Sequence, residues 1–352
     1  MPDKIATEQD TSRRGHSVSV GILPAHHWAT QDPPPLEEID EDDSALGSDT
    51  ASSTASLTSS ILHYRTLHGR RYHSERGNAQ YWASNDEQQN EALDILHHVL
   101  TLCTNGKLHQ APIKKGIQKA IDIGTGTGIW ALDFADQFPD TEVIGTDISA
   151  IQPSWVPPNL KFEIEDCTGE WTFAPNSVDY VHIRWLLGSI ADWTELFKQA
   201  YRCLKPGGYV ESFEPDSVMQ SDDGTVKETS AMGQWGKFFE EGGKKLGRPF
   251  SVLSDRLQRK GMEGAGFVDI EELDFKTPLG SWPHGPREKE IGRYSRLVAD
   301  QDTEGFVLFA ANTIGWTKDE IMVYVSHLRR EIRSPKHHGY YQQRIVWARK
   351  PE

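Results

Sequence analysis

Short apolar runs alternate with amphipathic stretches along most of this chain. Runs that suit a buried strand lie at residues 120–123, 142–147, 160–164, 178–183, 209–213, 267–273 and 345–349. Segments with the apolar spacing of a helix face lie between several of these runs. Because alternating strands and helices are typical of a doubly wound α/β sheet, the pattern predicts a seven-stranded, mostly parallel sheet.

The helix between the fourth and fifth strands has the clearest boundaries. Its expected N-cap is Asp192, and its apolar stripe is Leu196, Phe197, Ala200, Tyr201 and Leu204. The Lys-Pro-Gly-Gly sequence at 205–208 should end the helix and lead into the fifth strand. We expect this helix to be part of the scaffold.

The first 60 residues differ in composition from the rest. Three prolines at 33–35 precede six acidic residues within 37–43, and a tract rich in Ser, Thr and Ala runs from Ser44 to Ser60. Such a segment buries too little apolar surface to fold, so residues 1–60 are predicted to be a disordered tail. The tail is either an inert solubilising segment or a regulatory arm that binds a protein partner.

Ordered structure is expected from residue 61 onward, in one domain that spans residues 61–352. An amphipathic helix is predicted within about 61–110, with Asn85 or Ser84 as its cap. Its apolar face contains Leu93, Leu96, His97 and Leu100. A helical segment in this position, ahead of the sheet, is the arrangement expected of a lid.

The most informative stretch is the glycine-rich turn after the first strand. Gly124, Gly126 and Gly128 alternate at a strand-to-helix junction, where residues without a Cβ let a ligand lie against backbone N–H groups. A dinucleotide fingerprint needs a small residue where this chain has Ile129, which disfavours NAD. The Gly-Lys-Ser/Thr triplet of a P-loop does not follow these glycines, which disfavours ATP hydrolysis.

Acidic residues stand at three of the predicted strands. Asp122 precedes the glycines, Asp147 ends the second strand, and Asp166 follows the third. Asp147 lies 23 positions after Gly124, close to the roughly 20 expected for a carboxylate that accepts from ribose hydroxyls. Asp166 either accepts from an adenine amino group or is a solvated turn residue. The pattern predicts a cofactor of nucleoside type.

An acid followed by G-x-G-x-G, with a second acid after the next strand, resembles the class I S-adenosylmethionine-dependent methyltransferases. The sequences G-R-R-Y-H at 69–73, Y-x-x-x-N-D-E at 81–87 and N-G-K-L-H at 105–109 narrow the resemblance to the fungal LaeA-like methyltransferases. The similarity covers nearly the whole chain. It implies S-adenosylmethionine as the cofactor and a last strand that is antiparallel to its neighbours.

In the family that the chain resembles, the lid closes over the cofactor. The resemblance therefore makes Tyr72, Tyr81 and Trp82 candidates for shielding the sulfonium, because aromatic faces attract cations. We assign Tyr81 to the cofactor site. For Trp82, packing of the lid against the sheet is the preferred interpretation.

Groups for catalysis are marked less clearly. His182 and Arg184 lie at the end of the fourth strand, and Glu214 lies just past the fifth. His182 and Glu214 are the candidate general bases, although a histidine in an apolar strand is more often a hydrogen-bonded core residue. Alignment of donor and acceptor can supply most of the rate, so a base is not essential. Aromatic residues that either line an acceptor pocket or belong to the core are Trp282, Phe306, Phe309, Trp316 and Tyr324.

Composition narrows the range of partners. A formal net charge of −15 over 352 residues disfavours a general nucleic-acid surface. The three cysteines lack the spacing of a disulfide framework or a zinc site, and no apolar run is long enough to span a membrane. A soluble protein of the cytoplasm or nucleus is expected.

The sequence thus predicts methyl transfer from S-adenosylmethionine to a small metabolite or a protein acceptor, linked to secondary metabolism. A cofactor-binding regulatory protein with little catalysis is the alternative from another functional class. An NAD-dependent oxidoreductase is a further alternative, which Ile129 disfavours.

Overall fold

The computed structural model describes residues 20–31, 64–74 and 81–352. The helices are α1 (Ala25–Ala29), α2 (Glu87–Cys103), α3 (Ile129–Gln137), α4 (Trp193–Cys203), α5 (Ala231–Leu246), α6 (Leu257–Ala265), α7 (Pro286–Thr313) and α8 (Lys318–Arg333). The strands are β1 (Arg65–Leu67), β2 (Arg70–Tyr72), β3 (Lys119–Ile123), β4 (Glu142–Asp147), β5 (Leu160–Ile164), β6 (Val178–Arg184), β7 (Leu204–Gln220), β8 (Val268–Pro278) and β9 (Tyr340–Arg349).

Seven of the strands form one sheet in the order β5-β4-β3-β6-β7-β9-β8. The pairs from β5 to β7 are parallel, whereas β9 runs antiparallel to both β7 and β8. The predicted seven-stranded, mostly parallel sheet with an antiparallel last strand is confirmed. The chain reverses its direction of winding between β3 and β6, and ligands bind outside the carboxyl ends of strands at such a switch point.

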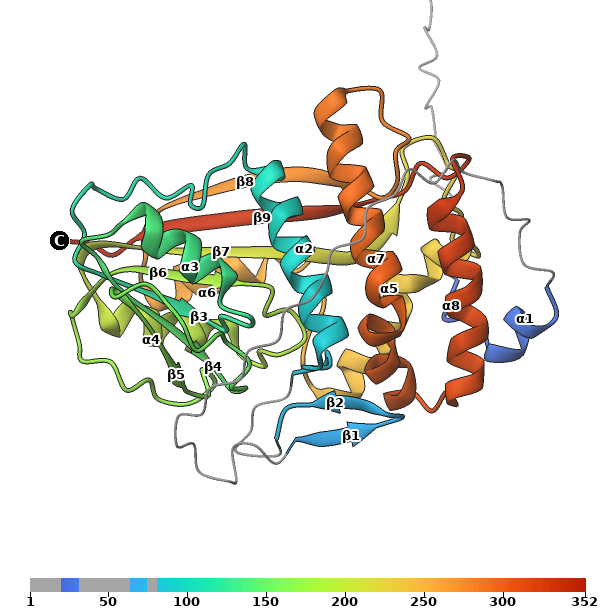
Figure 1. The fold of residues 1–352 in the computed structure, drawn as a ribbon, viewed down its shortest axis with the longest axis horizontal. Helices are drawn as coiled ribbons and strands as arrows, with labels where there is room; N and C mark the ends of the chain where they lie inside the picture. Colours follow the sequence, from blue (N-terminus) through green and yellow to red (C-terminus); the bar gives the residue numbers. More distant parts are fainter. Residues whose placement is uncertain (1–19, 32–63, 75–80) are drawn as a thin grey trace, which may run out of the picture.

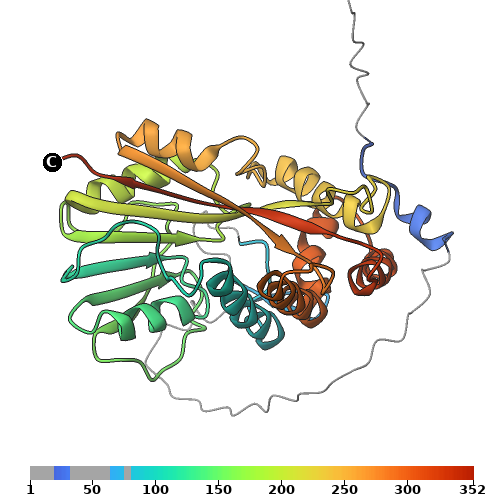
Figure 2. The same cartoon turned by 90° about the horizontal axis from the view of Figure 1, so that it is seen from above.

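Helices lie on both faces of this sheet. α2 and α3 cover one face, and α4 and α6 cover the other (Figure 2). The long strands β7, β8 and β9 extend out of the parallel part of the sheet toward a helical region that contains α5, α7 and α8 (Figure 1). The molecule therefore has two neighbouring parts, a sheet that can hold a cofactor and a helical region beside it.

The predicted helix between the fourth and fifth strands is confirmed as α4. Asp192 caps it by accepting from two backbone N–H groups of the first turn, and Leu196, Phe197 and Ala200 are buried. The helix ends at Cys203. Leu204, the expected last residue of the apolar stripe, is instead the first residue of β7. β7 continues to Gln220, well past the predicted end at 213, because it pairs along its length with β9.

The prediction of a disordered tail over residues 1–60 does not hold for residues 20–31. These residues include α1, and the Trp28 side chain is only 2% exposed. Its ring packs at 5.2 Å from Tyr324 and 5.6 Å from His327 of α8. The composition averaged over the tail is polar, so it did not reveal a short apolar cluster that packs on α8. The rest of the predicted tail, with its acidic and Ser/Thr-rich tracts, lies outside the described residues.

The predicted lid segment at about 61–110 contains a short hairpin, β1 and β2, followed by α2. The N-cap of α2 is Asp86, which accepts from Gln89 N at 3.2 Å, and not Asn85 or Ser84 as predicted. Those two side chains have other partners, since Ser84 Oγ accepts from Arg70 and Asn85 reaches toward the sheet. Residues 61–63 lie outside the described residues.

Arg70 holds the hairpin, α2 and α7 together. Its buried guanidinium donates to both carboxylate oxygens of Asp86 and to both of Asp302. Asp302 interrupts α7 with non-helical backbone angles and is fully buried. One guanidinium therefore serves two carboxylates, of which Asp302 is fully buried and Asp86 is partly exposed, and these ion pairs fix the lid against the helical region.

Candidate functional site

The glycine turn forms the floor of a cavity at the carboxyl ends of β3 and β4. Gly124, Gly126 and Gly128 have φ values of 69°, 59° and 84°, which favour glycine. A Cβ at Gly124 would lie 2.6 Å from Leu186, and one at Gly128 would lie 2.3 Å from the Phe162 ring. A Cβ at Gly126 would meet no atom within 4 Å. The outer glycines therefore allow close packing, and the middle one faces open space.

Asp147 lies beside that open space. Its Oδ2 accepts from Gly126 N at 2.9 Å, and its Oδ1 accepts from Ser149 N at 2.9 Å. Burial raises the pKa of this carboxyl to about 6, although both N–H groups favour the charged form. The side chain lines the cavity, and each oxygen retains lone pairs for a ligand hydroxyl.

The end of β5 contributes a second acidic group. Asp166 lines the same cavity, and its Oδ1 accepts from both Thr168 N (2.9 Å) and Thr168 Oγ1 (2.6 Å). This pairing orders the turn that follows β5. Asp147 and Asp166, predicted separately from sequence, thus line one cavity.

Asp122 lies beneath the cavity. It is 3% exposed, and it accepts from Thr125 Oγ1 at 2.6 Å. The structure does not place it among the lining residues. Its hydrogen bond with Thr125 ties the start of the glycine turn to β3. Asp122 therefore supports the turn and does not itself face the cavity.

His182 pairs with Asp122 from the neighbouring strand. Its Nδ1 lies 2.7 Å from Asp122 Oδ1, and its ring stacks on Trp130 with centroids 3.6 Å apart. Burial lowers the pKa of this histidine, in opposition to Asp122, which raises it. His182 is 2% exposed and is not among the residues that line this cavity. Its surroundings match those of a hydrogen-bonded core residue and lack the access that a general base needs.

Glu214 is also fully buried and lines neither this cavity nor the second cavity described below. Its carboxylate accepts from Leu186 N at 3.1 Å and from Leu187 N at 2.9 Å. Burial raises its pKa to about 8, whereas these backbone N–H groups lower it. Glu214 therefore braces the loop after β6, and the geometry gives it no access to an acceptor.

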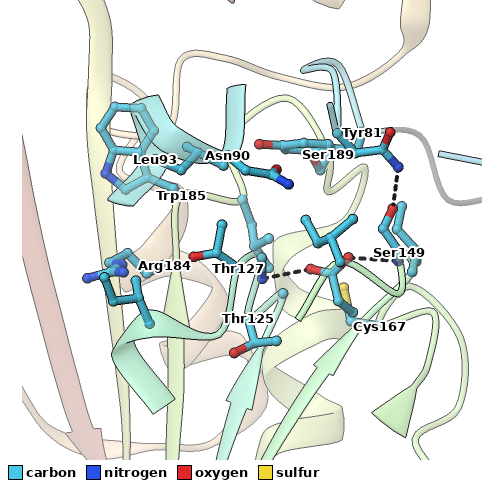
Figure 3. Close-up of a pocket in the computed structure, with 18 of the residues that line it drawn as sticks. Tyr81, Asn90, Leu93, Thr125, Thr127, Ser149, Cys167, Arg184, Trp185 and Ser189 are labelled. Carbon is cyan, nitrogen blue, oxygen red and sulfur yellow. Dashed lines mark hydrogen bonds between the residues drawn. The ribbon is translucent and has the colours of Figure 1, made fainter. Parts of the chain in front are cut away.

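The lid forms the opposite wall of the cavity. Figure 3 shows Tyr81, Asn90 and Leu93 facing the glycine turn. Two hydrogen bonds join the lid to the sheet: Asn85 Nδ2 donates to Ser149 Oγ at 3.1 Å, and Thr127 Oγ1 donates to Asp94 Oδ1 at 2.6 Å. Of the aromatic residues considered for shielding, Tyr81 lines the cavity.

The other two aromatic residues of the lid have packing positions. Tyr72 is 1% exposed against Phe309. Trp82 is 4% exposed and donates from Nε1 to Leu187 O at 2.8 Å. The preferred interpretation of Trp82 as a packing residue agrees with this position.

Several lining residues were not apparent from the sequence. Asn90 Oδ1, Glu165 Oε2 and Ser189 Oγ are buried and have no hydrogen-bond partner within the described part of the chain. They come from α2, the end of β5 and the loop after β6, and no short motif links them. Buried polar atoms are normally paired, so these three atoms are suited to a polar ligand.

Arg184 is the remaining charged group of the cavity wall (Figure 3). Its Nη1 lies 3.1 Å from His97 Nδ1, and His97 Nε2 lies 2.9 Å from Asp133 Oδ2. Burial lowers the pKa of Arg184 to about 10, which leaves it charged at neutral pH. This residue, already a candidate in the sequence, connects the lid helix to β6.

The geometry does not favour an oxidoreductase. A Tyr-x-x-x-Lys pair after the fourth strand would favour an NAD-dependent oxidoreductase. This spacing occurs at Tyr201 and Lys205, but Lys205 Nζ pairs with Asp179 at 2.9 Å. Neither residue lines the cavity. Tyr201 lies in α4 and Lys205 near the start of β7, so both belong to the scaffold.

A second cavity adjoins the first, between the lid and the helical region. Among the aromatic residues expected either in an acceptor pocket or in the core, Phe306 lines it. Trp316 and Tyr324 instead pack on Phe238, at 4.8 and 4.6 Å. Tyr324 therefore belongs to the core, Phe309 and Trp316 pack half-buried against it, and Trp282 stacks on His338 at 5.2 Å.

No helix in the described ranges, 20–31, 64–74 and 81–352, is long and apolar enough to cross a membrane.

Comparison with known proteins identifies the family. Residues 87–272 match the model of a methyltransferase domain. "Methyltransferase pytC" of Aspergillus terreus is 37% identical over 91% of this chain and 98% of its own length. A "secondary metabolism regulator" of Cochliobolus heterostrophus is 35% identical over 81% of this chain and 94% of its own length. The chain belongs to the methyltransferase-domain family, within the fungal group that includes these LaeA-like relatives.

Among solved structures, phosphoethanolamine N-methyltransferase 2 of Haemonchus contortus, in complex with S-adenosyl-L-methionine, is 25% identical. The match covers 75% of this chain and 53% of that one, with a TM-score of 0.43. The family assignment by itself agrees with S-adenosylmethionine as the expected cofactor.

Proposed function

We propose that the cavity above the glycine turn binds S-adenosylmethionine and that the chain catalyses methyl transfer to an acceptor in secondary metabolism. The observation that carries this proposal is the position of Asp147, which is hydrogen-bonded to Gly126 N and lines the cavity. A carboxylate against the open middle glycine is suited to a nucleoside that has hydroxyl groups and no phosphate.

The residues present fit that cofactor. Gly126 leaves free space where a side chain would otherwise stand, and the unpartnered Asn90 Oδ1, Glu165 Oε2 and Ser189 Oγ offer acceptors and a hydroxyl to its polar groups. Asp147 would accept from the ribose hydroxyls, and Asp166 would accept from the adenine amino group. When bound, S-adenosylmethionine supplies a methyl group that is activated on a sulfonium.

The chain contributes mainly by position and by exclusion of water. Tyr81 and the lid helix face the glycine turn across the cavity, and the Asn85–Ser149 and Asp94–Thr127 bonds hold them there. Correct alignment of donor and acceptor can lower a barrier by roughly 7–11 kcal/mol. The buried positions of His182 and Glu214 support a mechanism in which neither acts as the base.

Titration calorimetry with S-adenosylmethionine, S-adenosylhomocysteine and NAD tests the proposal. We expect the first two to bind and NAD not to bind. Asp147→Ala should weaken binding by about 1.5–3 kcal/mol, the range for hydrogen bonds to a charged group. The matched control is Asp140→Ala, at an exposed aspartate of the turn before β4. Binding of NAD alone, or equal affinities for both variants, would contradict the proposal.

A regulatory role with little catalysis is a second candidate, since one of the relatives is named a secondary metabolism regulator. Both roles require cofactor binding. Transfer of label from radioactive S-adenosylmethionine to any acceptor favours the enzyme, whereas binding without transfer favours the regulator.

A further inference from the structure

The second cavity lies between the lid, β7 and the helical region, and its empty volume including the mouth is about 750 Å³. Most of its lining is apolar or aromatic. The lining residues that bear on its chemistry are Trp82, Trp185, Phe239, Phe250, Phe306 and Asp216. The apolar and aromatic character of this lining matches that of pockets that proteins use for small ligands.

The second cavity shares part of its wall with the cofactor cavity. Leu96 of the lid helix and Trp185 of the loop after β6 line both. Trp185 has a φ of 59°, an uncommon backbone conformation for a bulky residue. Trp185 N donates to Phe213 O at 3.0 Å, and Glu214 binds the two N–H groups that follow. The loop therefore holds Trp185 in a fixed position between the two cavities.

The Trp185 indole has a free hydrogen-bond donor. Its Nε1 is buried and has no partner within the described ranges. A buried donor without a partner costs about 1–3 kcal/mol, so a ligand with an acceptor atom at this place is favoured. Trp185 also belongs to the wall that the two cavities share, where an acceptor molecule must meet the methyl group.

We infer that the second cavity is the methyl-acceptor site and that it takes a mainly apolar small molecule with one oxygen or nitrogen near Trp185. This inference rests on the proposed methyltransferase function and names its substrate class. A lysine or arginine side chain of a protein acceptor would be desolvated among these aromatic residues, with Asp216 as the single carboxylate of the lining. An apolar ring system instead gains from its burial.

The transfer balances without a further reactant. A lone pair of the acceptor atom forms a bond to the methyl carbon while the carbon–sulfur bond breaks, and its electrons stay on sulfur as a neutral thioether. The proton of an acceptor hydroxyl passes to water or to Asp216, whose Oδ1 accepts from Val218 N at 3.0 Å.

The test fills the cavity from one wall. Ala299 of α7 lines it, and Ala299→Leu and Ala299→Trp add graded bulk. The matched control is Leu297→Trp on the same helix, at a side chain that is 45% exposed. Full-length protein is incubated with radiolabelled S-adenosylmethionine and a fungal extract. Label is then counted separately in organic-soluble compounds and in precipitated protein, and binding of S-adenosylhomocysteine is measured in parallel.

We expect label in the organic-soluble fraction, a loss of at least tenfold in Ala299→Trp and a smaller loss in Ala299→Leu. The affinity for S-adenosylhomocysteine should stay within twofold of wild type. Label in protein alone, no transfer despite cofactor binding, or full activity in Ala299→Leu would overturn the acceptor assignment and leave the cofactor proposal intact. Lack of S-adenosylhomocysteine binding by the wild type would instead contradict the cofactor proposal itself.

Discussion

Three glycines with the same spacing and the same sign of φ have different physical functions. Gly124 and Gly128 must lack a side chain because of their neighbours: a Cβ would collide with Leu186 at Gly124 and with Phe162 at Gly128. Gly126 has free space in front of it and donates its N–H to Asp147. At the residue scale, substitution of the middle glycine therefore tests ligand binding, whereas substitution of the outer two tests packing.

Gly126→Val should abolish cofactor binding while the protein stays folded, because its side chain would occupy the space above the turn. Backbone strain at positive φ costs on the order of 1–3 kcal/mol. Gly224→Val is the matched control, since Gly224 also has a positive φ (75°) and open space but lies outside the cavity. Calorimetry with S-adenosylhomocysteine and thermal unfolding separate the two effects. Wild-type affinity in Gly126→Val would show that the turn is only a structural bend.

Asp147 should make cofactor affinity depend on pH. Burial raises its pKa to about 6, and a protonated carboxyl loses charge and one acceptor position for hydroxyl donors. The affinity for S-adenosylhomocysteine is expected to fall as the pH decreases from 8 to 5. Asp147→Asn, which does not titrate, should bind more weakly at pH 8 and lose this dependence. An equal pH profile in both proteins would exclude Asp147 as the titrating group.

At the scale of elements, the loop after β6 depends on a carboxylate from the neighbouring strand. Glu214 of β7 satisfies two consecutive N–H groups of the loop that carries Trp185. The loop lies against both cavities. An acid that the sequence marked as a candidate base thus positions a wall of the site.

Glu214→Gln should destabilise the fold by about 1–3 kcal/mol at pH 5, because one loop N–H loses its acceptor. The folded-state pKa of about 8 lies above the unfolded value near 4.3. The contribution of this group is fully present below pH 4.3 and is lost as the pH rises through 8. The stability difference between wild type and variant should therefore shrink toward pH 8.5. Urea unfolding at several pH values measures it, with exposed Glu290→Gln as control. A difference that grows with pH would contradict the raised pKa.

At the scale of the whole molecule, a short N-terminal segment is part of the core. Trp28 of α1 packs on α8, and its carbonyl oxygen lies 3.0 Å from His327 Nε2. Two backbone N–H groups of this segment also donate to side chains near the start of α5: Leu23 N to Gln234 Oε1 and Val20 N to Glu228 Oε1. Residues 20–31 therefore fasten the helical region that lines the second cavity.

Trp28→Ala should lower the free energy of unfolding by about 3–5 kcal/mol, the usual cost of removing a large buried aromatic side chain. The matched control is Trp155→Ala, at a side chain that is 85% exposed. Denaturant unfolding with tryptophan fluorescence and circular dichroism measures both variants. Equal stability of the two would show that α1 does not contribute to the core, and removal of residues 1–31 would then also have little effect.

The sequence by itself determined the sheet, the glycine turn and the acids at the strand ends. These features depend on local periodicity and on short spacings, so the alternation of apolar runs predicted seven strands and the position of Asp147. The same local information misjudged α1, because a composition averaged over 60 residues hid one buried tryptophan.

Only the tertiary structure decided which of the candidate groups face a ligand. Asp122, His182 and Glu214 stand at or next to the ends of the predicted strands, as Asp147 does, yet they are buried by neighbours distant in sequence. Ser189 and Asn90 have no motif, but folding brings their unpartnered polar atoms to one cavity. Access to a cavity depends on contacts between elements that are far apart along the chain. For that reason, the type of residue at a strand end follows from the sequence, whereas whether that residue can contact a ligand follows from the packing of the fold.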